Sequence, residues 1–180
     1  MQNRDATAAV IGAGDFIGAA IAKKFASEGF TVFAGRRRGE KLAPLIAEIE
    51  AAGGHIVGRS LDARKEEEIT TFLRDADAAA PLEVCVFNIG ANVNFPLLET
   101  TERVFRKVWE MACYAGFLTG REAARLMLPR SPATSFLPAP PPECAAGSAM
   151  SPLPALSSAY GPSRRALRAS SARRGSTSLI

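Results

Sequence analysis

Residues 6–130 alternate between two patterns of apolar positions. Short, almost continuously apolar runs are typical of strands that are covered on both faces, and they occupy residues 7–11, 30–34, 55–58 and 82–87. Between the runs, apolar residues recur every three or four positions, which is the period of one helix face. This spacing predicts helices over about 17–28 and 41–52, around 69–76, and over 101–127. Strands that alternate with helices predict an α/β fold with a parallel sheet.

The pattern changes after Arg130, where prolines, serines and alanines replace the alternation. Proline removes a backbone donor, and a segment with almost no acids and many prolines does not form a central strand or a core helix. We therefore expect residues 131–180 to be an irregular or disordered Pro/Ser/Arg-rich tail, with a short helix feasible only at 163–174. The sheet is predicted to be truncated after about four strands, which gives one domain over 1–130. Translation of a GC-rich gene in the wrong frame would produce such a change, and we hypothesise that the tail is frame-shifted.

The formal net charge of +4 arises in that tail, which holds five arginines and one glutamate beyond Arg130. The rest of the chain, residues 1–130, is neutral, which argues against a dedicated nucleic-acid surface.

The chain has no apolar run long enough for a membrane span and no apolar signal segment at residues 1–10, so we expect a cytoplasmic protein without a membrane partner. Three cysteines without CxxC spacing and a single histidine, His55, predict no metal site and no disulfide framework. His55 is interpreted as a strand-edge residue.

A glycine-rich turn follows the first predicted strand and opens the first predicted helix. Gly12 permits a tight turn, Gly14 lets the backbone approach a phosphate, and Gly18 lets the helix pack closely on the sheet. Phe16 and Ile17 lie where backbone N–H groups at a helix N-terminus bind a pyrophosphate. This arrangement predicts a dinucleotide site in a Rossmann-like, doubly wound sheet.

Arginines follow the second predicted strand. NAD-preferring enzymes keep an acidic residue near this point to hold the ribose 2′-hydroxyl, but the first acid here is Glu40. Arg36 and Arg37 instead suit a 2′-phosphate through charge-assisted hydrogen bonds. NADP is therefore predicted in preference to NAD, and the alternative is a solvated basic turn.

With these motifs the chain resembles the short-chain dehydrogenase/reductase superfamily over about residues 7–130. The resemblance rests on the glycine turn and on three motifs that follow the later strands, namely Gly35-Arg36-Arg37, Asp62-Ala63 and Asn88-Ile89-Gly90. It implies an NAD(P)-dependent oxidoreductase that transfers hydride between nicotinamide and a small carbonyl or alcohol substrate. It also implies that Asp62 hydrogen-bonds at the adenine edge and that Asn88 and Gly90 shape the cofactor side of the fourth strand.

The sequence departs from this family in its catalytic residues. Phe16 stands in place of the family's middle glycine, and Cys113 stands where the family has an active-site asparagine. The family's Ser…Tyr-x-x-x-Lys set has no counterpart, because the last lysine of the chain is Lys107. Weak candidates for this set are Ser148, Tyr160 and Arg164, although Pro162 would break the family's helix.

The chain is therefore expected to be catalytically incomplete. The alternatives are a non-catalytic nucleotide-binding or interaction module and, less favoured, an arginine-rich tail that recruits RNA or acidic partners. Because the family's partner helix is missing, the stripe of Val104, Val108, Met111 and Leu118 is expected to be partly exposed. A homo-oligomer formed through the helix at 101–127 is the predicted consequence.

Overall fold

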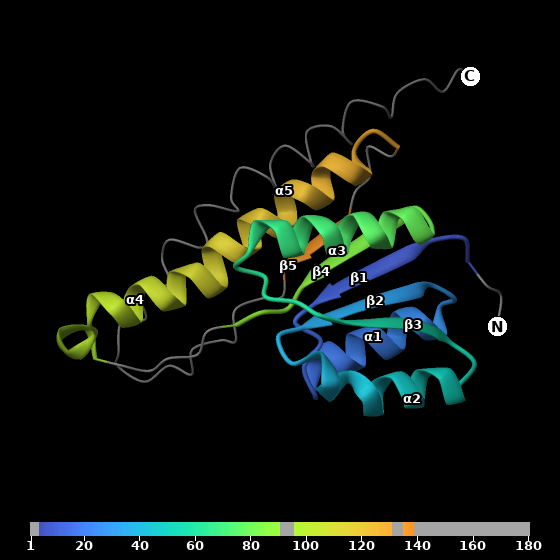
Figure 1. The fold of residues 1–180 in the computed structure, drawn as a ribbon, viewed down its shortest axis with the longest axis horizontal. Coiled ribbons are helices and arrows are strands. Elements are labelled where there is room, and N and C mark those ends of the chain that lie inside the picture. The colour runs from blue at the N-terminus through green and yellow to red at the C-terminus, as the bar shows by residue number, and fades with distance from the viewer. Residues whose placement is uncertain (1–3, 91–95, 131–134, 139–180) are drawn as a thin grey trace, which may run out of the picture.

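A computed structural model describes residues 4–90, 96–130 and 135–138 of the 180-residue chain. Within them, parallel strands form one five-stranded sheet with helices on both faces (Figure 1). The strands are β1 (Thr7–Ile11), β2 (Thr31–Arg36), β3 (His55–Ser60), β4 (Leu82–Phe87) and β5 (Ser135–Pro138). The helices are α1 (Ile17–Ser27), α2 (Ala43–Ala51), α3 (Glu66–Ala79), α4 (Glu102–Trp109) and α5 (Ala115–Met127), with 3-10 turns η1 (Gly39–Leu42) and η2 (Leu97–Glu99) and a π-helical turn η3 (Glu110–Tyr114). The predicted Rossmann-like α/β fold is confirmed.

The strand order is β3-β2-β1-β4-β5. The chain builds outward from β1 to β3 and then crosses to the other side of β1 to form β4. The carboxyl ends of the central strands are level, because Ile11 pairs with Gly35 of β2 and with Phe87 of β4. Open parallel sheets bind ligands outside these carboxyl ends, at the point where the strand order reverses. The topology therefore places the candidate site between the loops that follow β1 and β4.

β5 extends the sheet beyond the four strands predicted from the sequence. It pairs in parallel with β4, from Val84 opposite Ser135 to Phe87 opposite Pro138. It is an edge strand of the described sheet and ends at a proline, a position that tolerates the missing donor. The proline-rich stretch was expected to be extended or disordered and unfit for a central strand. An extended segment at the sheet edge is compatible with that composition.

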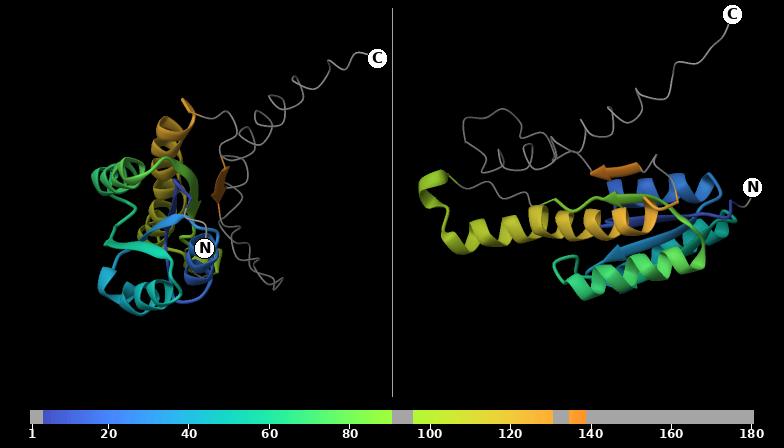
Figure 2. Two further views of the ribbon diagram at one scale, coloured as in Figure 1. Left: turned by 90° about the vertical axis from the view of Figure 1, so that its right-hand side faces the viewer. Right: turned by 90° about the horizontal axis from the view of Figure 1, so that it is seen from above.

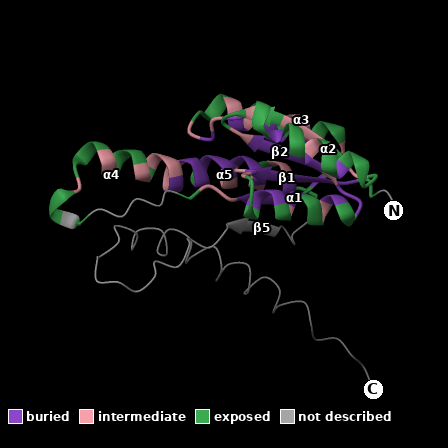
Figure 3. Cartoon of the chain, turned by 90° about the horizontal axis from the view of Figure 1, so that it is seen from below, coloured by how far each residue is buried: buried purple, intermediate pink, exposed green. Residues whose placement is uncertain are grey.

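Different helices cover the two faces of the sheet. One buried cluster joins α1 and α2 to the strands, with Ala22 and Leu45 among its members. The other joins α3 and α5 to the opposite face, with Leu73 and Leu118 among its members. Every residue of β1 is buried between the two layers, as the purple strand in Figure 3 shows. No helix in the described part of the chain is long and apolar enough to cross a bilayer.

The helix predicted at 101–127 is present as α4, η3 and α5 in succession. α5 packs on the sheet and is largely buried, whereas α4 has no buried residue and runs past the edge of the sheet (Figure 2). Of the predicted stripe, Leu118 is 2% exposed and belongs to the core. Val104, Val108 and Met111 are half-buried, as expected.

The large exposed side chains of this helix lie outside the predicted stripe. Phe105, Trp109 and Phe117 are each about half exposed, at 48%, 46% and 55%. The rings of Trp109 and Tyr114 stack with centroids 5.8 Å apart and planes at 20°. Residues five apart lie far around an α-helix of 3.6 residues per turn, whereas the wider π-turn of η3 brings them onto one face.

Candidate functional site

The glycine-rich turn after β1 is hydrogen-bonded to a residue of β2 and to a residue that follows β4. The N–H of Gly12 donates to the carbonyl oxygen of Gly35 at 2.8 Å, and Asn88 Nδ2 donates to the carbonyl oxygen of Gly12 at 3.0 Å. Gly12 has a φ of +87°, and a Cβ there would lie 2.6 Å from the carbonyl oxygen of Asn88. Only glycine fits this position, so the motifs after β1 and β4 form one rigid structure.

The N-terminus of α1 packs on this turn and leaves its outer side open. A Cβ on Gly18 would lie 2.5 Å from the carbonyl oxygen of Gly12, whereas one on Gly14 would have no atom nearer than 4.0 Å. Within the described residues, the backbone N–H groups of residues 15–18 have no acceptor. Free donors at a helix N-terminus beside open space suit a phosphate. The turn therefore fits a pyrophosphate, with Phe16 and Ile17 exposed at its rim.

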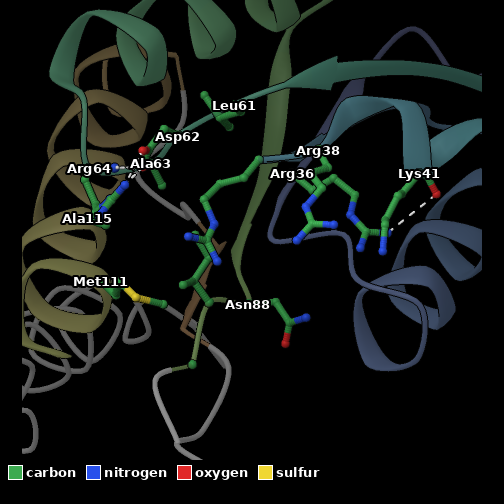
Figure 4. Close-up of a pocket in the computed structure, with 13 residues that line it drawn as sticks. Arg36, Arg38, Lys41, Leu61, Asp62, Ala63, Arg64, Asn88, Met111 and Ala115 are labelled. Carbon is green, nitrogen blue, oxygen red and sulfur yellow. Dashed lines mark hydrogen bonds and ion pairs between the residues drawn. The ribbon is translucent and has the colours of Figure 1, made fainter. Parts of the chain in front are cut away.

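A cavity of about 450 Å³ adjoins the turn at the carboxyl ends of β2, β3 and β4. Figure 4 shows basic side chains on one side of it, the Asp62 loop and the long helix on the other, and Asn88 between them. The lining residues are Arg36, Arg37, Arg38, Lys41, Leu61, Asp62, Ala63, Arg64, Asn88, Ile89, Gly90, Met111 and Ala115.

Two of the arginines in this cavity are already paired with carboxylates. Arg36 Nη1 lies 2.7 Å from Asp15 Oδ1. Arg64 donates two hydrogen bonds to Asp62, from Nε to Oδ1 at 2.9 Å and from Nη2 to Oδ2 at 2.5 Å. The hydrogen bonds from Arg64 lower the pKa of Asp62 to about 2, so this carboxylate is ionised at neutral pH.

The other cations of the cavity remain available. Arg37, Arg38 and Lys41 make no ion pair with any residue that the structure describes. Arg37 is close enough to Asp62 for its charge to contribute to the lowered pKa of that carboxyl. The cavity therefore presents unneutralised positive charge next to an open helix N-terminus, a combination that attracts anions.

The structure brings most of the predicted site residues together. Seven of them line the one cavity, namely Arg36, Arg37, Asp62, Ala63, Asn88, Ile89 and Gly90. None of the five predicted residues of the glycine turn lines it. Gly12 is joined to it through the hydrogen bond from Asn88, and Gly14 lines a smaller cavity beside α2. The catalytic candidates Ser148, Tyr160 and Arg164 lie outside the described residues, as does most of the tail predicted at 131–180, of which only 135–138 are described.

Sequence reasoning missed several residues of the cavity. Lys41 could have been noticed from the sequence, since it lies three residues after the run of arginines at 36–38. The indication for Arg64, which lies two residues after Asp62, was weaker and rests on the tendency of a carboxylate and an arginine at that spacing to form an ion pair. Met111 and Ala115 come from η3 and α5, far along the chain, and nothing in the local sequence predicts their place.

Cys113 does not line the cavity, although its neighbours in the long helix do. It is half-buried, and burial raises the pKa of its thiol. Cys85 lies in the core, where burial raises the pKa of its thiol to about 12. No group of three or more His, Cys, Asp or Glu side chains that could hold a metal ion occurs in the part of the chain that the structure describes.

Curated proteins similar to this chain include a reductase and a dehydrogenase. The chain is 30% identical over 124 residues to an NADPH-dependent 1-acyldihydroxyacetone phosphate reductase of Saccharomyces cerevisiae, a match that covers 67% of this chain and 41% of that protein. It is 27% identical over 125 residues to a 2-dehydro-3-deoxy-D-gluconate 5-dehydrogenase of Formosa agariphila, over 68% of this chain and 47% of that protein. The chain spans less than half the length of these two relatives.

Solved structures with the same fold include two with a bound cofactor. A short-chain dehydrogenase from Rhodopseudomonas palustris is 74% identical with a TM-score of 0.73, over 75% of this chain and 63% of that one. A metagenomic short-chain oxidoreductase in complex with NADP is 29% identical with a TM-score of 0.70, over 76% and 62%. A variant of actinorhodin polyketide ketoreductase with NADPH is 26% identical with a TM-score of 0.70, over 76% and 54%.

The family model described as short chain dehydrogenase matches residues 6–134, which include the glycine turn and every described residue of the cavity. Together with the confirmed Rossmann-like topology, this match shows that the chain belongs to the short-chain dehydrogenase family.

Proposed function

We propose that this chain binds NADP in preference to NAD at the cavity beside the glycine turn. The observation that supports this most is a set of three cations after β2, Arg37, Arg38 and Lys41, which line the cavity and make no ion pair with any described residue. A 2′-phosphate is the group that distinguishes NADP, and guanidinium and ammonium groups bind it through charge-assisted hydrogen bonds. The similar proteins that bind or depend on NADP or NADPH support the same preference.

Other residues of the site would contact the remaining parts of the cofactor. The open N–H groups of residues 15–18 would hold the pyrophosphate. Asp62, which lines the cavity in the loop after β3, would hydrogen-bond at the adenine edge. Asn88 holds the glycine turn in place through its hydrogen bond to Gly12. When bound, the cofactor would donate a hydride to a carbonyl substrate or accept one from an alcohol.

Titration of the full chain with NADPH and NADH, followed by nucleotide fluorescence, tests the cofactor proposal. The wild-type chain should bind NADPH more tightly. Arg37→Ala should weaken NADPH binding about tenfold, because a charge-assisted contact is lost, and should leave NADH binding unchanged. Arg103→Ala removes an exposed arginine from α4 and serves as the control. Equal affinities for both nucleotides, or an unchanged preference in Arg37→Ala, would contradict the proposal.

We propose further that the chain supplies the cofactor half of a reductase without a competent proton relay. No lysine follows Lys107, and Cys113 occupies the position of the family's asparagine. Saturable NADPH binding without turnover on a panel of carbonyl compounds is the expected result, and it also fits the alternative of a non-catalytic nucleotide-binding module. Turnover that disappears in Tyr160→Phe would overturn this proposal.

Self-association through the long helix is the third part of the proposal. α4 has no buried residue, and Phe105 and Trp109 lie one helical turn apart and are half exposed. Large apolar side chains gathered on one exposed helix face are typical of a protein interface.

A further inference from the structure

We propose that Asp15 limits the preference of the site for a 2′-phosphate by offsetting the charge of Arg36 at the boundary of the cavity. This inference rests on the proposed NADP site and adds a residue that weakens it. Arg36 is the first of the three consecutive arginines that follow Gly35, yet among the described residues it alone of the three has a carboxylate partner.

The position of Arg36 is set by contacts on one side of its guanidinium. Nη1 donates to Asp15 Oδ1 at 2.7 Å and lies 3.5 Å from the carbonyl oxygen of Lys41. The Arg36 side chain is 19% exposed, whereas that of Asp15 is 65% exposed. Arg36 is therefore held inside the protein surface, and its partner projects from the glycine turn into solvent.

Two cavities meet at Arg36. The larger one, next to Arg37 and Asn88, does not include Asp15. A smaller one of about 150 Å³, between the glycine turn and α2, is lined by Asp15 and Arg36. Arg36 lines both cavities and Asp15 only the smaller one, so the ion pair places the guanidinium at their boundary. The charge of Asp15 therefore offsets that of Arg36 beside the larger cavity, where a phosphate would bind.

Substitution of Asp15 by asparagine isolates this effect. The amide keeps the shape of the side chain and an oxygen acceptor but loses the charge. An exposed ion pair is weak, so its removal should strengthen binding of a 2′-phosphate about three- to fivefold. Arg36→Ala should have little effect in the wild-type chain and should abolish the gain in the Asp15→Asn background.

Calorimetric titration with adenosine 2′,5′-bisphosphate and with 5′-AMP measures the effect without turnover. Both probes carry the 5′-phosphate, so the ratio of their affinities reports the 2′-phosphate alone. Glu48→Gln is the matched control, because Glu48 lines the same small cavity but pairs with Lys23. The ratio should rise in Asp15→Asn and stay constant in Glu48→Gln.

The outcomes separate this inference from the proposed function. If the wild-type ratio is above one and stays constant in Asp15→Asn, Asp15 has no influence on the 2′-phosphate. If the ratio falls in Asp15→Asn, Asp15 orients Arg36 toward the phosphate. In either case this inference alone would fail. An equal rise in Glu48→Gln would assign the effect to general charge and would overturn it as well. Equal binding of both probes by wild type and all variants would overturn the NADP proposal itself.

Discussion

The ion pair between Asp62 and Arg64 predicts a specific dependence of stability on pH. Hydrogen bonds from Arg64 lower the pKa of Asp62 from its ordinary value near 3.8 to about 2 in the folded chain. A lowered carboxyl pKa means that the folded state favours the ionised form, so the stabilisation is complete above the unfolded pKa and is lost as the pH falls through the folded pKa. The difference in unfolding free energy between wild type and Asp62→Asn should therefore be constant from about pH 5 to 8 and shrink between about pH 4 and 2.

Urea unfolding followed by circular dichroism across that range measures the difference. Asp5→Asn, which removes an exposed carboxylate outside any described ion pair, is the control for the general loss of charge in acid. Arg64→Gln should reproduce the profile of Asp62→Asn, because it removes the same hydrogen bonds. A difference that persists undiminished at pH 2 would show that Asp62 stabilises the fold by a route other than its ionised carboxylate.

At the scale of single residues, positions that depend on local geometry could be predicted and positions that depend on tertiary pairing could not. Gly12 and Gly18 were predicted because a strand, a turn and a helix in immediate succession require them. The partners of Arg36 and Arg64 were not predicted, because a run of arginines does not indicate which one is neutralised. Glu122 was not predicted to be buried, and it is 2% exposed between Arg74 and Arg125.

At the scale of elements, the hydrophobic period predicted the first four strands and the long helix, because burial against the sheet produces that period. It did not predict the π-turn η3, which breaks the helical register and moves Tyr114 beneath Trp109. Nor could it predict that α4 projects past the sheet, because projection depends on what the helix packs against. The exposed face is therefore defined by Phe105 and Trp109 rather than by the predicted stripe.

The exposed face of α4 predicts concentration-dependent self-association. In analytical ultracentrifugation the wild-type chain should sediment as a dimer or larger at tens of micromolar, and the double substitution of Phe105 and Trp109 by glutamate should sediment as a monomer. The two introduced carboxylates would have to lose their hydration in a helix–helix contact, which opposes association. Lys107→Glu, which also adds negative charge to α4 but on the opposite face, should retain the wild-type mass. Identical masses for all three proteins would contradict an interface on this face.

Fluorescence gives a second measurement of the same contact. Trp109 is the single tryptophan of the chain, so its emission reports this face of α4 alone. Dilution should shift the emission of the wild-type chain to the red as the ring becomes more exposed to water. The emission of Lys107→Glu should shift in the same way, and an emission that is independent of concentration would argue against burial of Trp109 on association.

At the scale of the whole molecule, the strand order carries the functional argument because it gathers distant motifs at one edge of the sheet. The crossover from β3 to β4 brings the loops after β1 and β4 together, and Asn88 then bonds directly to Gly12. This gathering could be predicted from the sequence, since parallel strands with helical crossovers admit few topologies. The contribution of Met111 and Ala115 to the cavity could not, because it depends on how the long helix lies across the sheet.

The change in composition near Arg130 leads to a prediction about the gene. The family match ends at residue 134, and the Rhodopseudomonas palustris protein matches 75% of this chain at 74% identity. A family match that ends at residue 134, followed by a stretch rich in Pro, Ser, Ala and Arg, is the pattern that a change of reading frame produces. β5 does not contradict this origin, because parallel strand pairing uses backbone groups that almost any extended segment provides.

Translation of the other two frames from the codon of Pro129 tests this prediction directly. One of them should encode an apolar strand, then a serine, and then a helix with the Tyr-x-x-x-Lys spacing that the chain lacks after Lys107. A chain restored in that frame should turn over carbonyl substrates with NADPH, whereas the chain described above should only bind the cofactor. If neither frame encodes these features, the tail belongs to the protein as it stands, and the nucleotide-binding module becomes the better account of its function.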